Sequence, residues 1–182
     1  MPQQARHPPR TSSVAATALP PGALLAAYAE TQAYTDCYSV TVGRPVSFAE
    51  YIESFYTTPP FKLERWLLGR LAGFPSTDAE ARLLAQGQVS RFAAWHVEAR
   101  EPHQAILAAG RTRSWLMVAP HPAEPDATTT LFFGSAVVPR KQGGMGWSFN
   151  ALLGFHKLYS RVLLGTAARR LARGSCHAQG LG

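Results

Sequence analysis

The feature that most constrains the fold of this chain is a long helical stretch near its C-terminus, from Trp147 to Ala172. At 100° per residue its outward-facing positions form one narrow stripe, made up of Asn150, Gly154, Lys157, Arg161 and Ala168. Most of the other positions are apolar, so this helix must be covered on several sides to be stable in water. A strongly curved antiparallel sheet has a concave face that can cover it. We therefore expect the rest of the chain to form such a sheet.

The residues before this helix contain the patterns of β-strands. Five stretches either alternate between apolar and polar residues or are rich in β-branched and aromatic residues. They are Tyr34–Val42, Val89–Arg100, Gln104–Ala108, Thr112–Ala119 and Thr129–Val138. The loops between the last four are short, which is typical of an antiparallel meander.

Two or three short helices are expected between the first strand and the meander. Ser47 is a predicted N-cap, and Glu50 three residues later completes a capping box. A third helical piece opens at Ser76 or Thr77 and ends near Gly87. Between them, a helix starts at Pro59-Pro60 and has apolar residues at helical spacing, namely Phe61, Leu63, Trp66, Leu67 and Leu71. The predicted fold class is α+β, with a curved antiparallel sheet wrapped around the long C-terminal helix.

Length and proline content predict the domain organisation. The 182 residues correspond to one domain, and 46% of them are hydrophobic, which is enough for a core. Five prolines lie within residues 1–22 before any periodic pattern, so this segment is expected to be a disordered leader. Residues 23–172 are the predicted domain, and residues 173–182 are a predicted disordered tail.

The lengths of the apolar runs and the number of cysteines indicate the cellular compartment. No run approaches the roughly 18 apolar residues that cross a bilayer, so no transmembrane segment is predicted. The two cysteines, Cys37 and Cys176, cannot form a disulfide framework, which favours a reducing, cytoplasmic environment.

The net charge of +7 is concentrated at one end of the chain. The last acidic residue is Asp126, and all seven basic residues after it are uncompensated, namely Arg140, Lys141, Lys157, Arg161, Arg169, Arg170 and Arg173. This region is either a solvated helix face or a surface for anionic lipid, nucleic acid or an acidic partner. These cations form no evident basic platform of the aromatic-interleaved kind that binds nucleic acid, so no specific nucleic-acid binding is predicted. Contact with a membrane surface stays open.

The order of elements from Tyr34 to Ala172 resembles that of the START-like superfamily, also called SRPBCC or helix-grip. The closer resemblance is to a bacterial branch of it and rests on Ala33–Asp36 (AYTD), Gly110–Trp115 (GRTRSW), Phe133–Ala136 (FGSA) and Gly154–Tyr159 (GFHKLY). This resemblance implies an apolar ligand cavity between the sheet and the C-terminal helix, where some members catalyse cyclisation or dehydration. It implies no cofactor, and fold alone does not choose among these roles.

The candidate ligand-binding residues are those expected to line that cavity. His156 lies on the apolar side of the last helix, where it could orient a polar ligand group or exchange a proton, or simply bond a backbone carbonyl. Arg113 would anchor a carboxylate or phosphate if its face of the strand points inward, and both faces of that strand have apolar members. The remaining candidates are Tyr159, Leu152, Leu163 and Trp95.

Two other groups of residues are candidate sites for a metal ion or a phosphate. His96, Glu98 and His103 could hold a metal, but they match no zinc motif, so no metal site is predicted. The glycine-rich Arg140–Gly146 precedes a helix and could hold phosphate, but it lacks the P-loop ending and is expected to be a connection or lid.

Three functions remain open at this point. The first is a module that binds a lipid-like, isoprenoid, polyketide or aromatic molecule in the cavity. The second is a cavity enzyme of the cyclase or dehydratase type that uses His156, Tyr159 or Arg113. The third is a basic protein that binds nucleic acid or a membrane through its C-terminal region. The residues favour binding over catalysis, because no arrangement of convergent catalytic groups is evident; catalytic residues, ligand identity and oligomeric state are not predicted.

Overall fold

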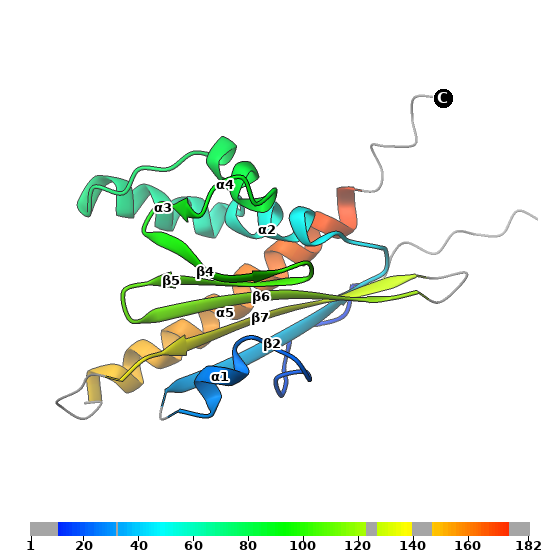
Figure 1. Cartoon of the computed structure of the whole chain (residues 1–182), viewed down its shortest axis with the longest axis horizontal. Coiled ribbons are helices and arrows are strands. Elements are labelled where there is room, and N and C mark those ends of the chain that lie inside the picture. The colour runs from blue at the N-terminus through cyan, green and yellow to red at the C-terminus, as the bar shows by residue number, and fades with distance from the viewer. Residues whose placement is uncertain (1–10, 32, 123–126, 140–146, 175–182) are drawn as a thin grey trace, which may run out of the picture.

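A curved antiparallel sheet forms the centre of the molecule, and the helices are distributed unequally over its two faces (Figure 1). The computed structural model describes residues 11–31, 33–122, 127–139 and 147–174, and for residues 147–156 it describes the backbone only. Within these residues seven strands lie in the order β1-β2-β7-β6-β5-β4-β3. The elements in chain order are β1 (Ala15–Ala16), α1 (Ala26–Ala29), β2 (Tyr34–Val42), α2 (Phe48–Tyr56), α3 (Pro59–Leu71), α4 (Asp78–Ala85), β3 (Arg91–Phe92), β4 (Trp95–Glu101), β5 (Gln104–Ala109), β6 (Thr112–His121), β7 (Thr128–Val137) and α5 (Trp147–Arg173).

The expected α+β fold class is confirmed. Each described strand pairs antiparallel with its neighbours, and α5 packs across the same face of the sheet as α2. We call this the helix face, and the opposite one the outer face. Residues of α5 buried on the helix face include Leu163 and Leu164, which join one core cluster with strand residues such as Leu116 and Val118.

Local signals position the helices after β2 as the sequence predicts. The Ser47 hydroxyl accepts a hydrogen bond from the Glu50 backbone amide at 3.2 Å, and the Glu50 carboxylate accepts one from the Ser47 amide at 2.8 Å. Thr77 and Glu80 form a second capping box at the start of α4. Because each box satisfies amides that the helix itself leaves unpaired, α2 and α4 begin where these residues occur.

The predicted strand from Val89 to Arg100 is wrong in two respects. Ala93 has a φ of 50° and lies in a tight turn that divides the stretch into β3 and β4. A bulge then interrupts the pairing of β4 with β5 between Val97 and Ala99. A bulge inserts one unpaired residue and so shifts the alternation of side chains along the strand. Ala99 therefore packs on the outer face. The Arg100 guanidinium donates hydrogen bonds to the Leu84 and Ala85 backbone carbonyls of α4.

The N-terminal segment also differs from the expectation of a disordered leader. The Ser12 amide donates to the Thr41 carbonyl at 2.9 Å, and β1 pairs with the edge of β2. Val14 packs against α5 at Gly165. Further along, Leu19 continues onto the outer face. Residues 11–22 therefore belong to the fold, because their apolar side chains cover surfaces that the sheet exposes.

The helix α5 is covered on fewer sides than its composition predicts. Ala168 was placed in the outward stripe, but it is fully buried. Lys157 and Arg161 are exposed as expected, whereas Leu158 and Val162 are exposed as well. The sheet and α2 thus cover one side of α5, and its other side keeps apolar residues in contact with solvent.

Candidate functional site

Aromatic side chains fill much of the helix face between the sheet and helices α2 and α3. Trp95 on β4 is buried here, and its ring centroid lies 5.2 Å from that of Phe61 on α3. The role of Trp95 in lining a ligand cavity stays a prediction. The Phe61 ring meets the Tyr56 ring edge-on at 4.7 Å, and Phe55 stacks on Phe133 of β7 at 4.8 Å. We name the aromatic cluster by its members, Phe55, Tyr56, Phe61, Phe92, Trp95 and Phe133.

A partly buried carboxyl group borders this cluster where α3 meets α5. The Tyr159 hydroxyl donates a short hydrogen bond to the Glu64 carboxylate. Burial raises the pKa of Glu64, and the hydrogen bond from Tyr159 offsets this only in part. Burial and the neighbouring Glu64 charge also raise the pKa of Tyr159. A carboxyl group with a raised pKa can hold or release a proton closer to neutral pH than an ordinary glutamate.

The Tyr56 hydroxyl is the second polar group near the cluster. Tyr56 is fully buried, and its hydroxyl finds no hydrogen-bond partner among the described residues. Burial raises its pKa, with a smaller effect from Glu64. A buried hydroxyl without a partner costs about 1–3 kcal/mol, so its presence calls for a further group that pairs with it.

Three other predicted residues lie on α5, and the structure describes the side chain of one of them. Leu163 is buried in the helix-face core, as predicted. The side chains of Leu152 and His156 lie outside the described residues, so their predicted roles stay predictions. Residue 156 is one helical turn before Tyr159 along α5.

Arg113 lies on the outer face, away from the aromatic cluster, which decides the orientation of its strand. Its Nε atom is 2.7 Å from the Glu98 carboxylate and 2.8 Å from the Tyr28 hydroxyl. Trp115, on the same face, is fully buried beside Leu25. The interpretation of Arg113 as an anchor inside the sheet–helix space is therefore wrong, because the N-terminal segment and α1 cover this face instead.

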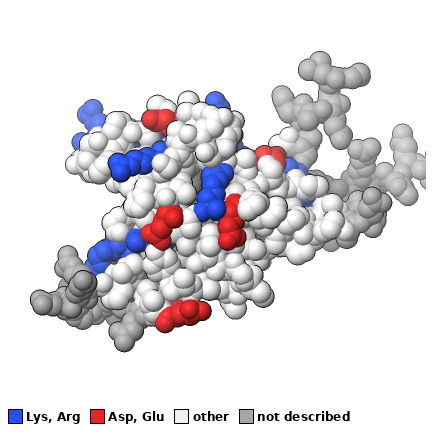
Figure 2. Space-filling view, in the orientation of Figure 1, with Lys and Arg blue, Asp and Glu red and all other residues white. Residues whose placement is uncertain are grey.

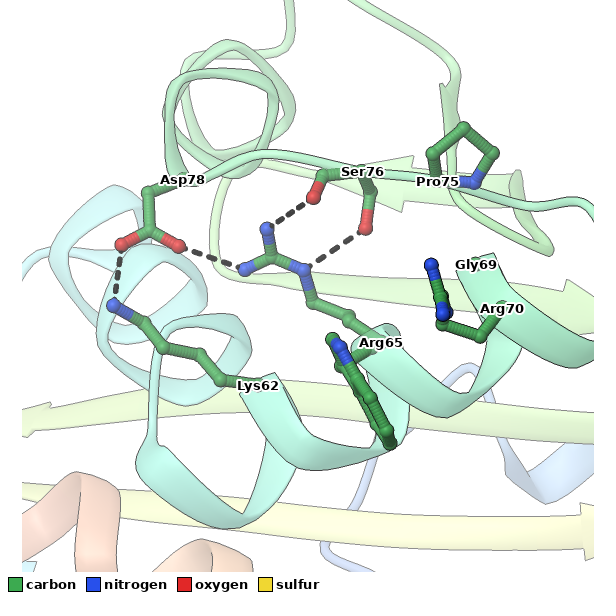
Figure 3. A pocket seen from close by; sticks show the side chains of 8 residues that line it. Lys62, Arg65, Gly69, Arg70, Pro75, Ser76 and Asp78 are labelled. Carbon is green, nitrogen blue, oxygen red and sulfur yellow. Dashed lines mark hydrogen bonds and ion pairs between the residues drawn. The ribbon is translucent and has the colours of Figure 1, made fainter.

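A pocket of about 400 Å³ lies beside α3 and the loop before α4 (Figure 3). The Arg65 guanidinium donates to Ser76 and to the Asp78 carboxylate from inside it. Burial opposes ionisation of Asp78, but hydrogen bonds and charge from Lys62 and Arg65 outweigh it and lower the Asp78 pKa. Because Arg65 is almost fully engaged within the protein, it joins α3 to α4 and leaves little capacity for a ligand. The pocket is lined by Lys62, Arg65, Trp66, Gly69, Arg70, Pro75, Ser76 and Asp78.

The structure describes the candidate metal grouping but not the candidate phosphate grouping. Among the described residues, no three His, Cys, Asp or Glu side chains are grouped as metal ligands would be. His96 and His103 are exposed, and Glu98 instead binds Arg113 and Tyr28. The glycine-rich stretch 140–146 lies outside the described residues.

Glu64 and Tyr56 were not predicted as site residues, although the sequence contains a signal for one of them. Glu64 comes three residues after Phe61 and four before Leu68, so helical spacing places all three on one side of α3. An acidic residue on an apolar helix side is a candidate for a buried functional group. Nothing in the sequence distinguishes Tyr56 from an ordinary core tyrosine.

Comparison with models of protein families, with curated proteins and with solved structures found no match to this chain. Within the described residues, no helix is both long enough and apolar enough to cross a membrane.

Proposed function

We propose that this protein binds a small, largely apolar molecule that carries a hydrogen-bonding group, on the helix face between α3, α5 and the sheet. The observation that carries the proposal is the buried Tyr56 hydroxyl, which lacks a partner among the described residues. A ligand hydroxyl or carbonyl would pair with it and remove the cost of burying it alone. Glu64 and Tyr159 offer a second polar contact nearby.

The surroundings of these groups support an apolar ligand. The buried aromatic cluster makes these surroundings apolar, and small-molecule sites are mostly apolar with a few placed polar groups. The helix-grip arrangement agrees with membership of the START-like superfamily, which we also propose. Lipid-like, isoprenoid, polyketide and aromatic molecules all fit this chemistry.

A second candidate function is proton transfer to a molecule bound at the same place. The raised pKa of the Glu64 carboxyl favours it, because general acids and bases work best when their pKa lies near the working pH. Tyr159 would then orient this carboxyl group. Of the residues named for an enzyme from the sequence, Arg113 takes no part, since it lies on the outer face.

Native mass spectrometry of the freshly purified chain tests the binding proposal. We expect a co-purified small molecule that leaves on denaturation, and binding of the neutral apolar probe N-phenyl-1-naphthylamine after it has been extracted. A folded chain with neither a bound molecule nor any affinity for the probe contradicts the proposal.

A matched pair of tyrosine variants locates the site. Tyr56→Phe removes the hydroxyl without a described partner, and we expect it to lower the affinity for the recovered molecule about fivefold, which is one hydrogen bond. Tyr51→Phe is the control, because Tyr51 is equally buried on α2 but its hydroxyl already donates to the Phe132 carbonyl at 3.0 Å. Equal affinities of the two variants would place the ligand elsewhere.

A further inference from the structure

The helix α3 turns a continuous apolar surface toward solvent. Exposed fractions are 59% for Leu63, 60% for Trp66, 41% for Leu67 and 82% for Leu71, and Phe74 just after the helix is 46% exposed. At 100° per residue, the four helical residues fall within a sector of about 140°. Monomeric proteins rarely leave apolar residues grouped in this way without an interaction partner. We call these five residues the α3 face.

The one charged residue within the sector of the α3 face is positive. Arg70 falls within this sector, whereas Lys62 lies about 40° beyond one edge of it and Glu64 about 20° beyond the other. The Glu64 carboxylate accepts a hydrogen bond from the Tyr159 hydroxyl of α5. Asp78 is held by Lys62 and Arg65 (Figure 3). A partner for this face must therefore combine an apolar layer with negative charge.

The neighbouring helix continues this chemistry. Near Tyr159, which meets α3 through Glu64, α5 exposes Leu158 and Val162. The neighbouring cations of α5 are Lys157, which lies over the Tyr34 ring, and Arg161, which donates to the Val14 carbonyl. On the side of the molecule drawn in Figure 2, Lys and Arg side chains also lie over α3 and α4 with few acidic ones between them. The whole chain carries a formal charge of +7.

We propose that the α3 face docks on the surface of a membrane that contains anionic lipid. The leucines and Phe74 would enter the boundary between headgroups and acyl chains, as in amphipathic helices that lie in the membrane plane. Trp66 would sit at headgroup level, where tryptophan is enriched. Arg70 would contact the lipid phosphates, because a basic side chain is attracted to an anionic membrane surface.

A second copy of this chain fits the α3 face less well than lipid. In a two-fold symmetric contact each residue of one copy meets the same patch of the other. Such a contact would bring two Arg70 side chains together over a sector of α3 without an acidic residue. An anionic lipid surface supplies the missing negative charge and requires no symmetric pairing.

Vesicle flotation of the full chain tests this proposal independently of any ligand on the helix face. We expect stronger binding to vesicles of phosphatidylcholine with phosphatidylglycerol than to phosphatidylcholine alone, and weaker binding as salt rises. Trp66 emission should be quenched by vesicles that contain brominated phosphatidylcholine, and the corresponding quenching should be lost in Trp66→Phe.

Two pairs of exposed-residue variants locate the contact on α3. The double variant Leu67→Ser/Leu71→Ser should weaken vesicle binding roughly tenfold or more. Its control is Leu83→Ser, which changes an exposed leucine of α4 and should leave vesicle binding unchanged. Arg70→Gln should weaken binding to anionic vesicles about fivefold, and Arg169→Gln on the C-terminal part of α5 is its control. Circular dichroism confirms that each variant is folded.

Three results would overturn the proposal. The first is no binding of the wild-type chain to either kind of vesicle. The second is undiminished binding of the α3 variants, which would move the contact to another surface. The third is a concentration-dependent dimer that Leu71→Ser abolishes while vesicle binding is absent, which would make the α3 face an interface between copies.

Discussion

Glu64 links two helices, and its partly buried position raises the pKa of its carboxyl group. Its carboxyl group joins α3 to α5 through Tyr159, and its burial disfavours the ionised form. In the folded chain the proton is therefore held to higher pH than in the unfolded chain. Between these two pKa values the folded state binds more protons, so the stability contribution of Glu64 falls as pH rises.

Glu64→Gln should reveal this linkage. The free energy of unfolding of the variant minus that of the wild-type chain should increase as pH rises above the ordinary glutamate pKa of 4.5. It should level off once Glu64 is ionised in the folded chain. Urea unfolding of both proteins over a pH series measures this difference, in which the contributions of unchanged groups cancel.

Glu50 provides a control of opposite sign. Burial acts against its ionisation, but hydrogen bonds from Ser47 and the Arg44 charge outweigh this and lower its pKa. Its contribution is therefore present above pH 4.5 and is lost as pH falls, so wild type should lose its advantage over Glu50→Gln in acid. For each variant, the quantity compared is its free energy of unfolding minus that of the wild type. If this difference changed with pH in the same way for both variants, it would contradict our account of Glu64.

At the scale of elements, α5 is a helix with one covered side. Its buried residues contact the sheet and α2, including a hydrogen bond at 3.3 Å from the Ser54 hydroxyl to the Ala167 carbonyl. On its opposite side, leucine and valine remain exposed at Leu158 and Val162. The free energy that holds α5 on the sheet must therefore come from its buried side.

A pair of adjacent truncations on α5 tests this division. Leu163→Ala should lower the free energy of unfolding by about 2–5 kcal/mol, because it leaves a cavity in the core. Val162→Ala, one residue earlier on the exposed side, should lower it by less than about 1 kcal/mol. Chemical denaturation measures both. Similar small losses for the two variants would mean that α5 is not packed as described.

At the scale of the whole molecule, the N-terminal segment closes the outer face of the sheet. The Leu24 amide donates to the Gln104 side chain at 2.9 Å, and the Trp115 indole donates to the same oxygen at 2.9 Å. Gly134 lies under Leu25, where an added Cβ would come within 2.7 Å of the leucine side chain. The sheet is thus shaped to receive this segment.

Deletion of residues 1–22 should therefore destabilise the chain rather than leave it unchanged. We expect a lower Tm, because the deletion removes the pairing of β1 with β2 and the packing of Val14 and Leu19. The matched control lacks only residues 1–10 and keeps every described contact of the segment. An unchanged Tm after the longer deletion would restore the interpretation of an independent leader. Thermal unfolding followed by circular dichroism measures the Tm of both deletions.

Short-range signals in the sequence determined most of the element order. Ser47 and Glu50 predict the start of α2 because a capping box needs only residues three apart, and the structure contains it. The aromatic and β-branched residues of Tyr34–Val42 predict β2 for a similar reason, since the preference of these residue types for strands is local. The α+β fold class followed from adding such local patterns, with the resemblance to the START-like superfamily as support.

Only the tertiary structure decided which faces are covered, because that depends on residues far apart in the chain. The alternation in Thr112–Ala119 allowed Arg113 either face, and contacts with Tyr28 and Glu98 place it outward. The pairing of Glu64 with Tyr159 joins residues 95 positions apart. The apolar pattern of α3 predicts a helix but does not say whether its apolar side is buried. In the structure this side is exposed to solvent. Periodicity determines which residues share a side of a helix, whereas the elements that pack against that side are set by the rest of the chain.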